Sequence, residues 1–158
     1  MNKFMSIANE LSRQNITTNN GGPFGAVVVK DNVVVGVGNN RVVGSNDPTA
    51  HGEIMAIRNA CKNLNTYDLS GCVLYTSCYP CPMCLSATIW ANIKEVYYGN
   101  TKEDAADIGF RDDFIYDYLY SLSKGEENNN TLKLNSMNRE ETIKAFEEFK
   151  NKNDKIIY

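Results

Sequence analysis

Apolar residues in the first forty positions change from a helical spacing to a strand-like one. Between residues 3 and 12 they recur at intervals of three and four, which predicts an amphipathic helix. Two runs rich in valine follow, at 26–30 and 33–37, and an Asp-Asn dipeptide separates them. β-branched runs joined by such a dipeptide are typical of a β-hairpin. The chain therefore begins with a helix and a hairpin.

The central part of the chain continues this alternation of helices and strands. Polar stretches at 15–22 and 41–48 predict loops. The further elements that the pattern predicts are a helix from about 50 to 63, a strand at 72–76, a helix at 84–91 and a strand at 95–98. Strands that alternate with helices in this way indicate a layered α/β sheet.

Beyond residue 100 the hydrophobic pattern is weaker. A tyrosine-rich helix is predicted at 112–122, followed by a polar, flexible stretch at 124–130. A last helix is predicted at 138–150, with Ile143, Ala145 and Phe146 facing inward. Because neither an internal repeat nor a second core-forming pattern is visible, we expect one domain over residues 1–158.

Composition narrows the class of protein. The 158 residues contain five cysteines, an odd number clustered between positions 61 and 84, which does not indicate a disulfide framework. The N-terminus lacks a signal-peptide pattern, and no apolar run is long enough to span a bilayer, so we expect a cytoplasmic protein. The net charge of −3 favours a small, uncharged substrate over a polyanion such as tRNA or DNA.

Two short stretches carry the chemistry. The first is His51-Gly52-Glu53, which contains the only histidine of the chain, and the second contains Cys81 and Cys84 within Pro-Cys-Pro-Met-Cys. One imidazole and two thiolates give three zinc ligands and leave a fourth position for water, as in a catalytic zinc site. Glu53 is then available to handle the proton of that water. H-x-E followed by P-C-x-x-C is the signature of zinc deaminases.

The spacing of these residues indicates where the metal lies. Cys81 and Cys84 share a face of one predicted helix, and thiolates near a helix N-terminus are stabilised by its dipole. His51 and Glu53 are two residues apart and converge only beyond the start of a helix. We therefore expect the zinc ion between two helix N-termini. A C-x-x-C pair on its own also occurs as a redox pair, as a structural half-site or by chance.

The chain resembles the cytidine deaminase superfamily, and within it the bacterial guanine deaminases of that fold. The segments that carry the resemblance are GGPFGAVVVKD at 21–31, SNDPTAHGE at 45–53, LYTSCYPCPMC at 74–84 and DAADIGFRDDFIY at 104–116, together with the terminal tyrosine. The resemblance implies a three-layer α/β/α fold with a central five-stranded mixed sheet. It also implies a homodimer in which the segment from about 124 to 158 crosses to the partner subunit.

The resemblance assigns roles to nine residues. It implies that His51, Cys81 and Cys84 bind zinc and that Glu53 and Asp112 transfer protons. Four further residues match positions that bind the base: Asn40, Phe24, Trp90 and Tyr158.

Trp90 is expected to reach the neighbouring subunit's site, and Tyr158 is expected to close over the substrate. Each of these residues also has an ordinary structural interpretation: Asn40 as a turn residue, Phe24 and Trp90 as core residues, Tyr158 as a frayed terminus. Asp113 remains an alternative to its neighbour Asp112.

The function predicted on these grounds is the hydrolysis of guanine to xanthine and ammonia, with a zinc-activated water and Glu53 as the acid/base. Deaminases of the same fold that act on cytosine, on a nucleoside or on tRNA adenosine are the nearest alternatives. A non-catalytic zinc-binding module is a different class, and it requires a fourth protein ligand. Cys78 is the candidate for that ligand.

Overall fold

The computed structural model describes residues 2–158. The chain divides into two compact units, Met1–Tyr116 and Asp117–Tyr158. The first unit contains a four-stranded sheet in the order β2-β1-β3-β4. Its strands are β1 (Gly25–Lys30), β2 (Val33–Asn39), β3 (Val73–Cys78) and β4 (Glu95–Asn100). β1 pairs antiparallel with both β2 and β3, whereas β3 pairs parallel with β4. The α/β prediction is therefore confirmed, but the predicted fifth strand is absent from the described residues.

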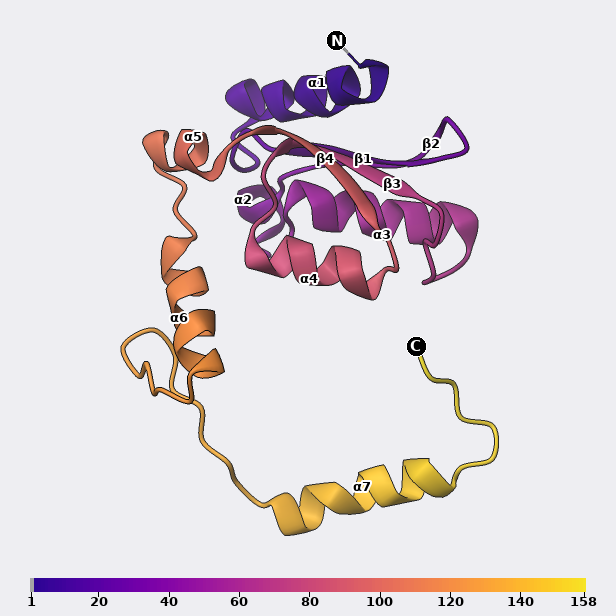
Figure 1. Ribbon diagram of the computed structural model, residues 1–158. Helices are drawn as coiled ribbons and strands as arrows, with labels where there is room; N and C mark the ends of the chain where they lie inside the picture. Colours follow the sequence, from indigo (N-terminus) through magenta and orange to yellow (C-terminus); the bar gives the residue numbers. More distant parts are fainter. Residues whose placement is uncertain (1) are drawn as a thin grey trace. The chain divides into compact units, whose positions relative to one another are not determined.

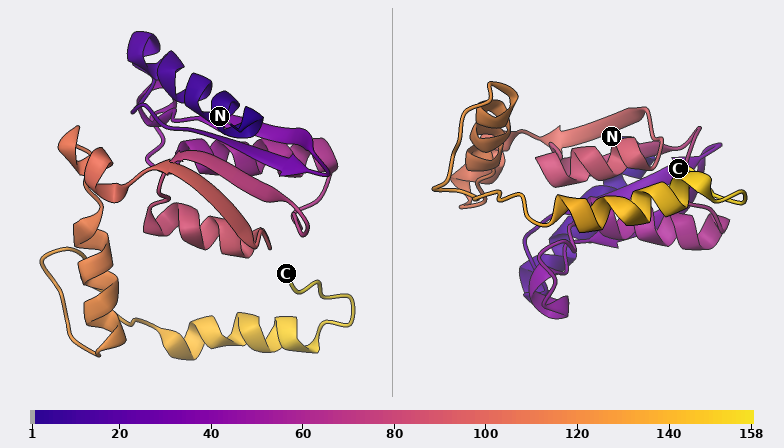
Figure 2. Two further views of the ribbon diagram at one scale, coloured as in Figure 1. Left: turned by 45° about the horizontal axis from the view of Figure 1, so that its top comes forward. Right: turned by 90° about the horizontal axis from the view of Figure 1, so that it is seen from below.

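Helices cover both faces of this sheet (Figure 1). On one face lies α1 (Lys3–Thr18), and on the other lie α3 (Gly52–Leu64) and α4 (Pro82–Trp90), as Figure 2 also shows. Because β1 lies in the interior of the sheet and is covered on both sides, five of its six residues are buried. The three layers predicted from the sequence are thus present in the first unit.

The hairpin turn follows directly from its two residues. Asp31 and Asn32 both have positive φ, at 49° and 63°, as the common two-residue hairpin turns require. α1 is longer than the predicted 3–12. It begins at the N-cap Asn2, whose side chain accepts from the backbone N–H of Phe4 at 2.8 Å. It continues to Thr18 because its buried face includes the polar Asn15, which an apolar pattern does not detect.

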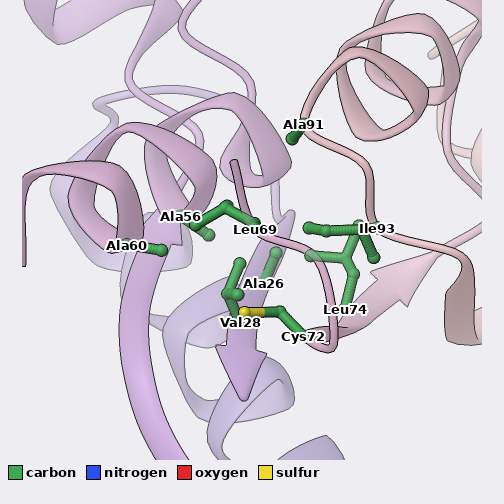
Figure 3. Packing of buried hydrophobic residues seen from close by; sticks show 9 residues of the cluster. All are labelled: Ala26, Val28, Ala56, Ala60, Leu69, Cys72, Leu74, Ala91 and Ile93. Carbon is green, nitrogen blue, oxygen red and sulfur yellow. The ribbon is translucent and has the colours of Figure 1, made fainter. Parts of the chain in front are cut away.

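The larger hydrophobic cluster of the first unit lies between the sheet and α3, and the segments before β3 and before β4 complete it (Figure 3). Leu69 and Leu74 are fully buried there, and small residues of α3 let the helix lie close to the strands. Gly38 of β2 shows how close this approach is. A Cβ atom at that position would lie 2.4 Å from the backbone oxygen of Gly52, at the first turn of α3. This close contact fixes the N-terminus of α3 against the sheet.

Three short elements follow or interrupt these layers. The predicted loop 41–48 contains a four-residue helix, α2 (Val42–Ser45). After β4 the chain forms α5 (Lys102–Asp107), which the weak hydrophobic pattern did not reveal. A capping box between Thr101 and Asp104 begins it. α6 (Asp113–Ser123) agrees closely with the tyrosine-rich helix predicted at 112–122.

The second unit contains the remainder of α6, from residue 117 to 123, and α7 (Arg139–Asn151). The helix was predicted, but the inward orientation of Ala145 and Phe146 was wrong, since both are exposed and no residue of α7 is buried. No helix among residues 2–158 is both long enough and apolar enough to cross a membrane.

Candidate active site

Two helix N-termini face one another at one end of the sheet and carry the predicted metal ligands. His51 is the N-cap residue of α3, and Cys81 is the N-cap residue of α4, with Pro82 in the first turn. Neither side chain caps its own helix, so both are directed to other partners. Cys84 lies in the first turn of α4. The arrangement between two helix starts is the one expected from the motif spacing.

The donor atoms of these three residues form a compact cluster. The ligand atoms of His51, Cys81 and Cys84 all lie within 4.8 Å of one another. The Nδ1 atom of His51 is 3.5 Å from the Sγ atom of Cys81 and 3.6 Å from that of Cys84. One imidazole nitrogen and two thiol sulfurs are a donor set that zinc prefers. Among residues 2–158 this is the one such group, and Cys78 does not belong to it.

Cys78 has a different environment from the two cysteines of the cluster. Its thiol donates to the backbone oxygen of Thr101 at 3.4 Å, and burial raises its pKa to about 11. Hydrogen bonding with Cys84 instead lowers the pKa of Cys81 to about 4, while the same interaction raises the pKa of Cys84. The thiolate form, which binds metal, is therefore favoured at Cys81 and disfavoured at Cys78.

Glu53 lies beside the cluster in a nearly closed environment. Its Oε1 atom accepts from the hydroxyl of Thr76 at 3.1 Å, and its Oε2 atom accepts from the thiol of Cys84 at 3.4 Å. Only 6% of the residue is exposed, and this burial raises the pKa of its carboxyl group above the usual value. A carboxyl group that is buried, fixed and raised in pKa is suited to exchange protons near neutral pH.

The cluster opens into a cavity of about 700 Å³ within the first unit. Its lining includes His51, Glu53 and Cys81, and also three of the predicted substrate or acid/base residues: Phe24, Asn40 and Asp112. Burial raises the pKa of Asp112, and the nearby Cys81 adds to this effect.

The neighbouring carboxylate, Asp113, is exposed and forms an ion pair with Arg111, its Oδ2 atom lying 2.5 Å from the Nη2 atom. The structure thus places Asp112, and not Asp113, along the cavity.

Two predicted substrate residues lie outside this lining. Trp90 is at the C-terminal end of α4 and 68% exposed, away from the cavity in its own chain. Tyr158 belongs to the second unit. Their predicted roles involve a partner subunit or a closing tail, so both remain predictions.

The cavity also contains residues to which the sequence analysis gave no role. The ring of Phe110 meets that of Phe24 edge to face, with centroids 5.0 Å apart. Lys102 also lines the cavity, and its ammonium group lies 4.5 Å from the ring centroid of Tyr116 and 5.2 Å from that of Tyr79. Phe110 lies inside the segment at 104–116 that carries the family resemblance, so the sequence could have indicated it as a cavity residue. Nothing in the sequence indicated Lys102.

A metal-binding trio with an adjacent carboxylate that is not a ligand, carried on an α/β sheet, is the arrangement of the zinc-dependent deaminases. Residues 1–100 match the family described as the cytidine and deoxycytidylate deaminase zinc-binding region. That match covers more than half of the chain. The chain therefore belongs to the cytidine and deoxycytidylate deaminase family.

Individual relatives point to purine-related members of this family. The guanine deaminase of Bacillus subtilis (strain 168) is 53% identical over 113 residues, which are 72% of this chain and 72% of that protein. The X-ray structure of guanine deaminase from Bacillus subtilis superposes with a TM-score of 0.90 and 42% identity, covering 100% of this chain and 99% of the other.

Two further relatives are more distant. A crystal structure of a mutant protein in complex with 8-azaguanine has 38% identity and a TM-score of 0.65, over 69% of this chain and 63% of that one. The tRNA-specific adenosine deaminase of Haemophilus influenzae is 40% identical over 61% of this chain and 56% of that protein.

Proposed function

We propose that this protein is a zinc-dependent guanine deaminase that hydrolyses guanine to xanthine and ammonia. The observation that carries the proposal is the buried Glu53 carboxyl group beside a three-donor cluster at the cavity. The similarity to the guanine deaminase of Bacillus subtilis supports guanine as the base.

His51, Cys81 and Cys84 would hold the zinc ion. Their donor atoms are close enough to share one ion, and they supply the nitrogen and sulfur ligands that zinc takes in catalytic sites. When bound with three protein ligands, zinc supplies a Lewis acid that lowers the pKa of a water molecule at the fourth position. The two thiolates balance the charge of the ion, so a separate group must accept the proton of the water.

Glu53 supplies that group. When Cys84 binds zinc as a thiolate it has no proton to donate, so the Oε2 atom of Glu53 would be available. This atom accepts the first proton of the water as the water oxygen adds to C2 of guanine. The carboxyl group passes this first proton to the ring nitrogen next to C2. It then takes the second water proton from the new hydroxyl group on C2 and gives it to the leaving amine, so that the C2–N bond breaks, the C2=O bond forms and ammonia departs. The hydroxyl of Thr76 holds Oε1 throughout, which fixes the plane of the carboxylate. The burial of Glu53 favours this exchange, since a carboxyl group with a raised pKa gives and takes a proton more readily near neutrality.

The cavity walls would hold the base. Phe24 and Phe110 offer aromatic surfaces for stacking, and Asn40 offers a side-chain amide to the polar edge of a purine. Asp112 lies along the same cavity with a raised pKa, which suits a second group that exchanges protons with the purine. A lining of aromatic rings, an amide and a carboxyl group suits a free base better than a polyanion, in agreement with the net charge of −3.

The protein would act as a homodimer whose C-terminal segment crosses to the partner, bringing Tyr158 over the partner's base. Three apolar surfaces that are exposed in the single chain support this proposal. The edge strand β4 exposes Tyr97 and Tyr98, α4 exposes Trp90 at its end, and the second unit exposes apolar residues up to the C-terminus.

Mixed dimers test the crossing. One chain carries Glu53→Gln with an intact tail, and the other has Glu53 but lacks residues 124–158. If the tail crosses, co-refolding these two inactive chains restores ammonia release; if it does not cross, the mixture stays inactive.

A substrate panel tests the assignment of the base. Purified, zinc-loaded protein is incubated with guanine, cytosine, adenine, adenosine and tRNA, and released ammonia is measured. Guanine should be turned over far faster than the others. Faster release from tRNA would favour the activity of the relative from Haemophilus influenzae, and release from none of them would favour a non-catalytic zinc-binding module.

A further inference from the structure

Asn15, near the end of α1, is a buried polar residue that the proposed mechanism does not use. Only 4% of it is exposed. Its Nδ2 atom donates to the backbone oxygen of Gly22 at 2.8 Å and to that of Asn40 at 2.7 Å. Gly22 and Asn40 are eighteen positions apart in the sequence, and both line the cavity. One amide group therefore ties two separate segments of the cavity wall together.

The orientation of this amide is fixed by its partners. The two N–H groups of a side-chain amide match the two carbonyl oxygens one to one, and the Gly22 oxygen also accepts from the backbone N–H of Phe24 at 2.8 Å. On the other side, the Oδ1 atom of Asn15 accepts from the hydroxyl of Thr18 at 3.1 Å and lies 3.4 Å from the Nδ2 atom of Asn39. A reversed amide would direct its oxygen at two carbonyl oxygens, so it is excluded.

Gly21 is a second residue that packs against Asn40. A Cβ atom at Gly21 would lie 2.0 Å from the Oδ1 atom of Asn40 and 2.9 Å from its backbone oxygen. The side chain of Asn40 thus packs directly on the α-carbon of Gly21. Its Oδ1 atom accepts from the backbone N–H of Val42 at 3.1 Å, so the amide oxygen already has a partner. This leaves the amide nitrogen to donate to a base.

We propose that Asn15 is a positioning residue that, together with Gly21, sets the place and orientation of the Asn40 amide at the base-binding wall. The inference rests on the proposed function, because it gives the Asn40 amide a base to contact. Removing the two donors of Asn15 takes the side-chain donor from the buried backbone oxygen of Asn40 and leaves the Gly22 oxygen with the backbone N–H of Phe24 alone. The two segments are then no longer tied together, and the segment that carries Asn40 shifts to regain a partner. A small displacement of a positioning group weakens binding of the base without changing the groups that transfer protons.

The variant Asn15→Leu tests this, because it keeps the approximate size of the side chain and removes both donors. Ser12→Ala is the matched control. Ser12 is also buried, lies on the same face of α1, and donates only to the backbone oxygen of Asn9 within that helix at 2.7 Å. The readouts are KM and kcat for the base that wild-type protein turns over, the dissociation constant of 8-azaguanine, the zinc content and the melting temperature.

Asn15→Leu is expected to raise KM and the dissociation constant about tenfold, with a much smaller change in kcat and unchanged zinc content. Ser12→Ala should leave both constants at wild-type values. A purely structural role would lower the melting temperature and the active fraction, but the remaining enzyme would keep the wild-type KM and dissociation constant. That outcome would overturn the inference.

Gly21→Ala provides a second test if Asn15→Leu does not fold. It leaves Asn15 in place and adds a methyl group that displaces the amide of Asn40, so the same rise in KM is expected. Wild-type constants in this variant would contradict the inference. KM and kcat are measured with whichever base the wild-type protein turns over. If that base is not guanine, the result contradicts the proposed function, whereas the comparison of the variants with the wild type still tests the role of Asn15.

Discussion

The two units of this chain differ in how much of their apolar surface each buries by itself. Met1–Tyr116 contains a sheet covered on both faces, a core and the whole of the cavity. Within Asp117–Tyr158, all of which the structure describes, Tyr118 is the one buried residue. Phe146, Ile157 and Tyr158 are each more than 70% exposed.

This difference shows where each unit obtains its stability. The first unit is large enough to offset the entropy of ordering its chain by burying its own side chains. The second unit is too short to do so, and its exposed aromatic residues are typical of a segment that packs against another surface. The ligands and the acid/base are therefore encoded within the first unit, whereas the role of the second depends on what it packs against.

Metal removal should produce the largest effect, and it acts on the first unit alone. Because the three donors and Glu53 all belong to that unit, chelation should abolish ammonia release, and added zinc should restore it. Protein treated with chelator already saturated with zinc is the control. Activity that survives complete removal of the metal, checked by elemental analysis, would contradict the account.

Glu53→Gln should lower kcat by about a thousandfold, because it removes the proton acceptor while keeping the shape of the side chain. Zinc content should stay at one ion per chain, since the three ligands remain. Glu10→Gln, an exposed change on α1, serves as the control. A near-normal kcat in the Glu53 variant would remove this residue from the mechanism.

A pair of truncations compares the cores of the two units directly. Leu74→Ala should lower the free energy of unfolding by about 2–5 kcal/mol, because Leu74 is fully buried in the core of the first unit. Phe146→Ala should change the unfolding of the first unit by less than about 0.5 kcal/mol, because Phe146 is exposed. The fluorescence of Trp90, the only tryptophan, reports the first unit in both variants. Equal destabilisation would mean that the units are not distinct.

Removing Tyr158 alone should have the smallest effect. If the tyrosine closes over the base, its loss should raise KM for guanine by about tenfold and leave the zinc content and melting temperature unchanged. Tyr158→Phe separates the ring from the hydroxyl group. A wild-type KM after removal would show that the tail has no part in the site.

The site could be predicted from the sequence largely because its chemistry depends on short spacings. His51 with Glu53, and Cys81 with Cys84, each begin a helix, and helix geometry alone brings such residues toward a common point. Interactions between distant segments were harder to predict. Asn15 extends α1 by bonding two carbonyl oxygens in loops, and no apolar pattern reveals a polar residue on a buried face.

The remaining errors concern the end of the chain. α5 depends on a capping box and carries no clear hydrophobic face, so its pattern was weak. α7 has the spacing of an amphipathic helix, and that spacing predicted a buried face. Periodicity shows that a face is apolar, but it does not show whether the same chain covers it. The number of strands is a different case, because the pattern itself predicted the four strands that form the sheet. The fifth strand was implied only by the family resemblance, and the described residues do not contain it.

The central claim is that three side chains of this protein hold the metal and that the fourth position is open to water. X-ray absorption spectroscopy of the zinc-loaded protein counts the sulfur and the lighter ligands directly. The account predicts two sulfur ligands, one imidazole nitrogen and one oxygen from solvent. A third sulfur, which Cys78 would have to supply, would close the fourth position and contradict the catalytic role.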